Sequence, residues 1–112
     1  MQFLALIYSS EGSEDVTMSE LLQQYADFGQ RASAAAVVEG GNALQPISTA
    51  TSVHIRQGKQ IILDGPFAET KEQLGGYYLL QCKDLDEAMM WAAQIPTARY
   101  GTIEVRPIND FG

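Results

Sequence analysis

The hydrophobic pattern begins with a run that has no polar alternation, Phe3 to Tyr8. Such a run is typical of a strand that is covered on both faces, or of a central strand in a tight dimer. A second run of this kind, residues 77–82, follows the diglycine Gly75-Gly76. We therefore expect two strands that are partners in the core of one sheet.

The first of two helical segments follows the first strand. Thr17 and Glu20 stand at the spacing of a capping box, which predicts a helix that begins near Met18. Gly40-Gly41 predicts its end, because glycine readily adopts a left-handed cap. The residues expected on the buried face, at the helical period, are Leu21, Tyr25, Phe28, Ala32 and Ala36.

The second helical segment repeats this logic. Asp84 and Glu87 again have capping-box spacing, and the helix must end before Pro96, which cannot continue it. Its predicted apolar stripe consists of Leu85, Ala88, Met89 and Ala92, widened by Met90 and Trp91.

Alternating segments complete the pattern. Residues 51–56 and 59–63 flank the two-residue turn Gln57-Gly58, which predicts a β-hairpin. Residues 102–106 alternate until Pro107 and predict a last strand. The order strand, helix, hairpin, strand, helix, strand fits an α+β fold: a ferredoxin-like two-layer sandwich with an antiparallel sheet and an added hairpin.

Composition narrows the class. The chain has 112 residues and a net charge of −7, which fits one domain over residues 1–112 and disfavours nucleic acid as a partner, since no run of basic residues exists. The apolar run at the N-terminus is too short for a membrane span or a signal segment, so we expect no membrane partner and a cytoplasmic location. Cys82, the one cysteine, is expected to be a buried and inert thiol.

The stretch from Asp64 to Tyr78 contains the densest group of turn and charged residues. We predict Asp64, Glu69 and Lys71 as catalytic residues. Asp64 would be a general base at a strand end, and Glu69, Lys71 and Glu72 would orient a polar ligand. The alternative for Asp64, which we favour, is a side chain that caps the turn before Gly65-Pro66. The alternative for Glu69 and Lys71 is a solvated loop.

Ligand-binding candidates lie outside that stretch as well. Tyr8 and Tyr78 are predicted to line a central cavity and to donate hydrogen bonds, although such tyrosines are more often core residues. Arg99 and Arg106 could bind a carboxylate, or could pair with local acids such as Glu104. A lone histidine and a lone cysteine offer no ligand spacing, and no phosphate-binding loop is present, so we predict no metal and no cofactor.

Several segments together resemble a known family. The residues that carry the resemblance are Asp64–Glu72, Leu74–Tyr78, Leu85–Ala88, Trp91-Ala92, Arg99–Gly101 and Glu104–Pro107. They resemble the DGPF proteins, a branch of the YCII-related superfamily. The resemblance implies a ferredoxin-like unit that pairs sheet to sheet as a dimeric α+β barrel, with a cavity between sheet and helices.

The chain also departs from that superfamily. Its other members are thought to carry a histidine on the first helix and an aspartate before the proline that follows the second helix. Here the first helix has no histidine and Ile95 precedes Pro96, so no such pair transfers.

Two functions remain open from the sequence. The first is a homodimer that binds a small apolar or aromatic metabolite, with acid–base chemistry from the Asp64 stretch. The second is a non-catalytic regulatory or interaction module. Its partner would be a sigma-factor-linked protein, as the resemblance implies.

Overall fold

A computed structural model describes residues 1–66 and 70–112 of the chain. Its elements are β1 (Gln2–Ser9), α1 (Met18–Ala34), β2 (Val38–Ala43), the 3₁₀ helix η1 (Ile47–Thr49), β3 (Thr51–Arg56), β4 (Lys59–Asp64), β5 (Gln73–Gln81), α2 (Leu85–Ala92), the 3₁₀ helix η2 (Pro96–Arg99) and β6 (Thr102–Pro107).

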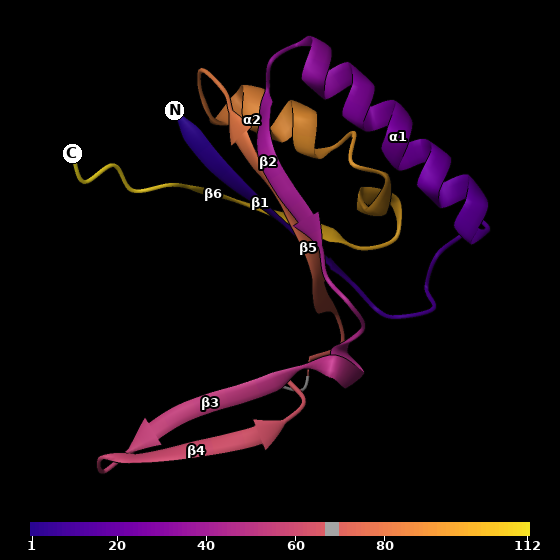
Figure 1. Ribbon diagram of the computed structural model, residues 1–112. Helices are drawn as coiled ribbons and strands as arrows, with labels where there is room; N and C mark the ends of the chain where they lie inside the picture. The colour runs from indigo at the N-terminus through magenta and orange to yellow at the C-terminus, as the bar shows by residue number, and fades with distance from the viewer. Residues whose placement is uncertain (67–69) are drawn as a thin grey trace.

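Four strands form an antiparallel sheet in the order β2-β5-β1-β6, with α1 and α2 on one side of it (Figure 1). Without β3 and β4, the chain order is βαββαβ, the ferredoxin-like arrangement that the sequence predicts. β3 and β4 form a separate hairpin between β2 and β5. The predicted pairing of the two apolar runs is confirmed, because β1 lies beside β5 with Phe3 opposite Leu80.

The core lies between the helices and the sheet. Successive strand residues point to opposite faces, so Phe3, Ala5 and Ile7 of β1 face the helices and are buried. Phe28 of α1 is fully buried against them. Its ring lies 5.2 Å from that of Tyr78 and 6.4 Å from that of Trp91, measured between centroids, so one aromatic cluster joins both helices to β5.

The opposite face of the sheet carries apolar residues that no described helix covers. The strand register places Leu4 beside Leu79 and Leu6 beside Tyr77. These residues and Tyr8 are only half-buried. We call Leu4, Leu6, Tyr8, Tyr77 and Leu79 the open face.

The first helix begins as predicted and ends earlier. Thr17 Oγ1 accepts a hydrogen bond from the Glu20 backbone N–H at 3.1 Å. The helix ends at Ala34, and Ala36 adopts φ of 56° while the Val37 N–H bonds to the Ala32 carbonyl at 3.0 Å. The prediction that Gly40-Gly41 caps the helix is therefore wrong. Burial of Val37 in the core offsets the cost of a left-handed alanine, roughly 1–2 kcal/mol.

The glycines instead serve the edge strand β2. A Cβ on Gly41 would lie 2.8 Å from the ring carbon Cδ1 of Tyr78 and 2.6 Å from the Tyr77 carbonyl oxygen. Glycine therefore lets β2 approach β5 closely. Gly76, buried inside β5, is in the same situation against Asn42.

The second helix also begins at its predicted cap, where Asp84 Oδ1 accepts a hydrogen bond from the Glu87 N–H at 2.9 Å. Ala88 and Ala92 are buried as predicted. Leu85 and Met89 are close to half exposed, because the two small alanines set the contact with the sheet and Trp91 fills the space beside them. No helix in the described part of the chain is long and apolar enough to cross a membrane.

Candidate functional site

A cavity of about 570 Å³ lies between the first half of α1, the adjoining ends of β2 and β5, and the loops before α1 and after β2. We call it the helix-side cavity. Its walls are mostly apolar, and their main apolar members are Ile7, Met18, Leu21, Leu22, Leu44, Ile47 and Leu74. This size is typical of a pocket for a small molecule.

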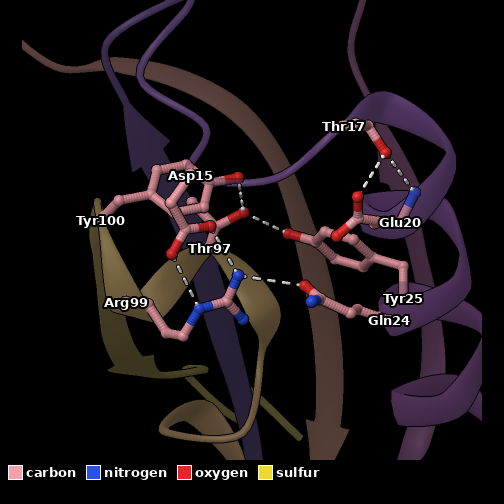
Figure 2. A network of polar contacts seen from close by, with 8 residues as sticks. All are labelled: Asp15, Thr17, Glu20, Gln24, Tyr25, Thr97, Arg99 and Tyr100. Carbon is pink, nitrogen blue, oxygen red and sulfur yellow. Dashed lines mark hydrogen bonds and ion pairs between the residues drawn. The ribbon is translucent and has the colours of Figure 1, made fainter.

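Hydroxyl groups form one wall of the helix-side cavity. The Tyr25 hydroxyl lies 2.6 Å from Thr97 Oγ1, and that atom lies 3.5 Å from the Tyr100 hydroxyl (Figure 2). Thr97 is buried, with 4% of its surface exposed. The chain therefore places a hydrogen-bonded hydroxyl pair, with a third hydroxyl beside it, against a mostly apolar space that Glu11, Glu14, Asn42 and Gln45 also line.

Two tyrosines that line the helix-side cavity have a pKa above the ordinary value of 10.0. Desolvation raises the pKa of Tyr25, and the hydrogen bond with Thr97 only partly opposes it. Burial also raises the pKa of Tyr78, to which the neighbouring Tyr25 adds. Both phenols are thus protonated at neutral pH, and they can donate hydrogen bonds rather than act as bases.

An ion pair holds this wall in place. Arg99, next to Tyr100, donates to both carboxylate oxygens of Asp15 at 2.8 and 3.3 Å and to Gln24 Oε1 at 3.1 Å (Figure 2). The guanidinium thereby joins η2 to α1 and to the loop before it. Arg99, predicted as a ligand-binding residue, is already engaged in a local ion pair.

The Asp15 carboxyl should report this ion pair directly. Its hydrogen bond with Arg99 holds its pKa below the ordinary value of 3.8. A lowered carboxyl pKa stabilises the fold above the unfolded-state pKa, and this contribution is lost as the pH falls through the folded-state pKa. We expect Arg99→Gln to return the Asp15 pKa toward 3.8, as measured by carbon-detected NMR titration of the side-chain carboxyl.

Arg31→Gln is the matched control for that titration, because Arg31 is an exposed cation in the last turn of α1, away from Asp15. It should leave the Asp15 titration where it is in the unaltered chain. An Asp15 pKa that moves equally in both variants would mean that long-range charge, and not the paired guanidinium, lowers it.

A second, more open cavity of about 730 Å³ lies at the end of the sheet. We call it the sheet-end cavity. It brings together two predicted site residues, Tyr8 and Lys71, together with Glu72 and Tyr100. Thr102 Oγ1 donates to Glu72 Oε1 at 2.8 Å, and Ser10 Oγ donates to the Lys71 carbonyl at 2.7 Å. Tyr100 lines both cavities, so the two lie next to each other at this residue.

The other predicted site residues lie apart. Asp64 ends β4, opposite Thr51 at the base of the hairpin, and lines neither cavity. Arg106 is exposed on β6 opposite Leu4, and no ion pair joins it to Glu104. Glu69 lies outside the described residues. The structure therefore separates Asp64 from Tyr78 and Arg99. Of the predicted catalytic residues that it describes, Lys71 lies in a cavity beside a tyrosine, and Glu72 lies there with it.

Sequence reasoning missed the hydroxyl wall. Tyr25 was predicted as an ordinary core residue, and its place on the apolar stripe of α1 gave no sign of its hydroxyl partner. Thr97 follows a proline in a connector. Its contact with Tyr25 depends on the packing of η2 against α1, which the sequence does not show. The sequence does contain one indication of this wall. A tyrosine among the apolar positions of a helix needs a polar partner for its hydroxyl group when it is buried.

Cys82 is buried, as the sequence predicts. Burial, together with the nearby Glu87 carboxylate, raises the pKa of its thiol. A protonated, buried thiol is a poor nucleophile. Within residues 1–66 and 70–112, no group of three histidine, cysteine, aspartate or glutamate residues is placed to hold a metal ion.

Comparison with known proteins agrees with this architecture. The family model of the YCII-related domain matches residues 1–112. The chain belongs to the YCII-related family. A relative in Rhizobium meliloti (strain 1021), described as an uncharacterized protein, is 37% identical over 105 residues, which cover 90% of this chain and 79% of the relative. The descriptions of the family and of this relative name no activity for a YCII-related domain.

Proposed function

We propose that this YCII-related domain binds a small apolar or aromatic molecule in the helix-side cavity. The observation that carries the proposal is a mostly apolar space of about 570 Å³ that has, in one wall, the hydroxyl pair of the half-buried Tyr25 and the buried Thr97. Apolar walls favour an apolar body in the ligand by burying it from water. The hydroxyl wall favours one hydrogen-bond acceptor, such as a carbonyl oxygen.

The tyrosines support the choice of an acceptor. A phenol is protonated at neutral pH, and burial raises the pKa of Tyr25 and Tyr78 further, so each has a proton to donate. With a ligand that has no acceptor, the hydroxyl groups of Tyr25 and Thr97 would hydrogen-bond only to each other. The difference between the two kinds of ligand should be that of one neutral hydrogen bond, roughly 0.5–1.5 kcal/mol.

We also propose that the domain could carry out acid–base chemistry on the bound ligand. Lys71 and Tyr8 line the sheet-end cavity, which shares Tyr100 with the helix-side cavity. A ligand group that reached past Tyr100 would meet the Lys71 ammonium. Asp64 and Glu69 stay predicted catalytic residues, and Asp64 would need a ligand or a partner that reaches the base of the hairpin.

We further propose that two copies of the chain pair as a homodimer through the open face. Leu4, Leu6 and Leu79 lie half-buried on the open face, where a second sheet would bury them fully. Strands that are apolar on both faces are typical of sheets covered on both sides. The homodimer therefore gives the open face a cover, and it is the arrangement implied by the resemblance to the DGPF branch.

Ligand binding can be tested with two probes of similar shape. Acetophenone has an aromatic ring and a carbonyl acceptor, whereas ethylbenzene lacks the acceptor. We expect both to shift the NMR signals of Leu21, Tyr25 and Tyr78, and acetophenone to bind more tightly by roughly two- to tenfold. Leu21→Trp fills the cavity and should abolish the shifts of both probes.

Ala26→Trp is the control for Leu21→Trp, because Ala26 is exposed on α1 and does not line the cavity. It should leave probe binding unchanged. If a folded Leu21→Trp protein bound both probes as the unaltered chain does, the helix-side cavity would not be the binding site. If no probe bound the unaltered chain, the non-catalytic module would become the better function.

A further inference from the structure

The β3–β4 hairpin stands away from the rest of the molecule. Figure 1 shows it extending from the end of the sheet to the side opposite α1, toward the space in front of the open face. The Cα radius of gyration is 15.9 Å, against about 13 Å for a compact domain of this length. The hairpin contributes to this elongation, as do the C-terminal residues that extend from β6 (Figure 1).

The exposed hairpin is unusually apolar. Its register places Val53 opposite Ile62, with Ile55 on the same side, and these three side chains are 57%, 58% and 64% exposed respectively. We call Val53, Ile55 and Ile62 the arm face. On the reverse side, Ile61 is 37% and Leu63 46% exposed, and His54 and Ser52 are half-buried.

A hairpin of two strands is only marginally stable in water unless something covers one of its faces. The turn explains part of its order, because Gln57 and Gly58 both have positive φ, as a tight two-residue turn requires. Such a turn gives no reason for three exposed β-branched residues in a row. A cover for the arm face gives one.

Charge and position indicate what the cover is. The turn carries Arg56 and Lys59, so the hairpin has two basic residues and one acidic residue, whereas the remainder of the chain has five basic and thirteen acidic residues. A basic tip is attracted to an acidic body, and a second copy of this chain is such a body. The same copy, if seated on the open face, would lie in the space toward which the hairpin extends.

We propose that the hairpin is an arm whose arm face packs against a second copy of the chain. In the dimer, the hairpin of each copy would contact the other copy. This inference rests on the proposed pairing through the open face. A two-fold arrangement repeats each contact, so the two arm faces are buried together with the two open faces. The arms then contribute to affinity as well as the sheets.

The contact can be tested on the unaltered chain by mixing isotope-labelled and unlabelled copies. In an isotope-filtered NOE experiment, we expect intermolecular signals from the methyl groups of Val53, Ile55 and Ile62 to the other copy. If those methyl groups show NOEs only within their own chain, the arm inference is wrong.

Variants test the energetic role of the arm. The triple variant Val53→Thr, Ile55→Thr and Ile62→Thr keeps β-branched residues and should raise the dimer Kd at least about tenfold in sedimentation velocity. The control, Ile61→Thr with Leu63→Thr, changes the reverse face and should have a much smaller effect. An unchanged Kd in the triple variant would overturn the inference.

The experiments distinguish a wrong arm inference from a wrong proposal that two copies pair through the open face. Leu6→Lys places a charge on the open face and should dissociate the dimer whether or not the arm contributes. If Leu6→Lys dissociates it while the arm variants and the NOE experiment show nothing, the pairing stands and the arm inference falls. If the unaltered chain is a monomer at micromolar concentration, both are wrong.

Discussion

Replacing Phe28 by alanine should destabilise the protein by about 3–5 kcal/mol, the range for a large aromatic side chain removed from a core. Phe28 is fully buried, and its ring joins Tyr78 of β5 to Trp91 of α2. Its loss removes apolar burial and leaves a cavity between the layers. Because domains are typically stable by only about 5–15 kcal/mol, this single change removes a large share of the total.

Urea denaturation followed by circular dichroism would measure the effect of Phe28→Ala as a lower midpoint with an unchanged slope. Phe111→Ala is the matched control, since Phe111 is 94% exposed near the C-terminus. It should change the free energy of unfolding by less than about 0.5 kcal/mol. A loss in Phe28→Ala as small as that would mean that the aromatic cluster does not hold the helices to the sheet.

Phe28 also connects the core to the proposed site. Tyr78 packs on the ring of Phe28 and lines the helix-side cavity with its own hydroxyl-bearing ring. A milder variant, Phe28→Leu, keeps most of the apolar volume but removes the ring that positions Tyr78. The cavity wall therefore depends on a residue that never contacts the cavity itself.

The sequence was informative about elements because local chemistry determines them. Thr17 and Asp84 cap the helices that were predicted from their spacing, and Gln57-Gly58 forms the predicted turn. Gly40-Gly41 was misread because glycine suits both a left-handed cap and a close strand contact. The end of α1 at Ala34 and the close approach of Gly41 to Tyr77 and Tyr78 across the sheet decide between these uses.

The site was less predictable because it depends on which way each strand residue points. Tyr8 and Tyr78 were both expected at one central cavity. In a strand that is apolar on both faces, the sequence does not show which residues point toward the helices. The strand register places Tyr78 on the helix side and Tyr8 on the open face. Two cavities thus replace the one that the pattern suggests. The Tyr25–Thr97 contact joins residues 72 positions apart, which no local pattern contains.

Gly101→Ala should have the second large effect, because Gly101 packs against β1 and against Thr97 of η2, next to residues that line the two cavities. A Cβ there would overlap the Tyr8 backbone carbonyl oxygen and would lie only 3.0 Å from both Ser9 Cβ and Thr97 Cγ2. A carbonyl in the central strand cannot move without straining its ladder, so overpacking of about 1–3 kcal/mol or more is expected. Thermal unfolding would measure the loss.

Gly29→Ala is the control that makes the Gly101 result specific. Nothing lies within 4 Å of a Cβ at Gly29, which is inside α1, and alanine there should stabilise the helix by roughly 0.5–1 kcal/mol. The two glycine-to-alanine changes should thus have opposite signs. In folded Gly101→Ala, displaced signals of Thr97 and Tyr8 would indicate that both cavities are altered together. Equal stabilisation by both substitutions would show that β1 and η2 do not meet as closely as this at Gly101.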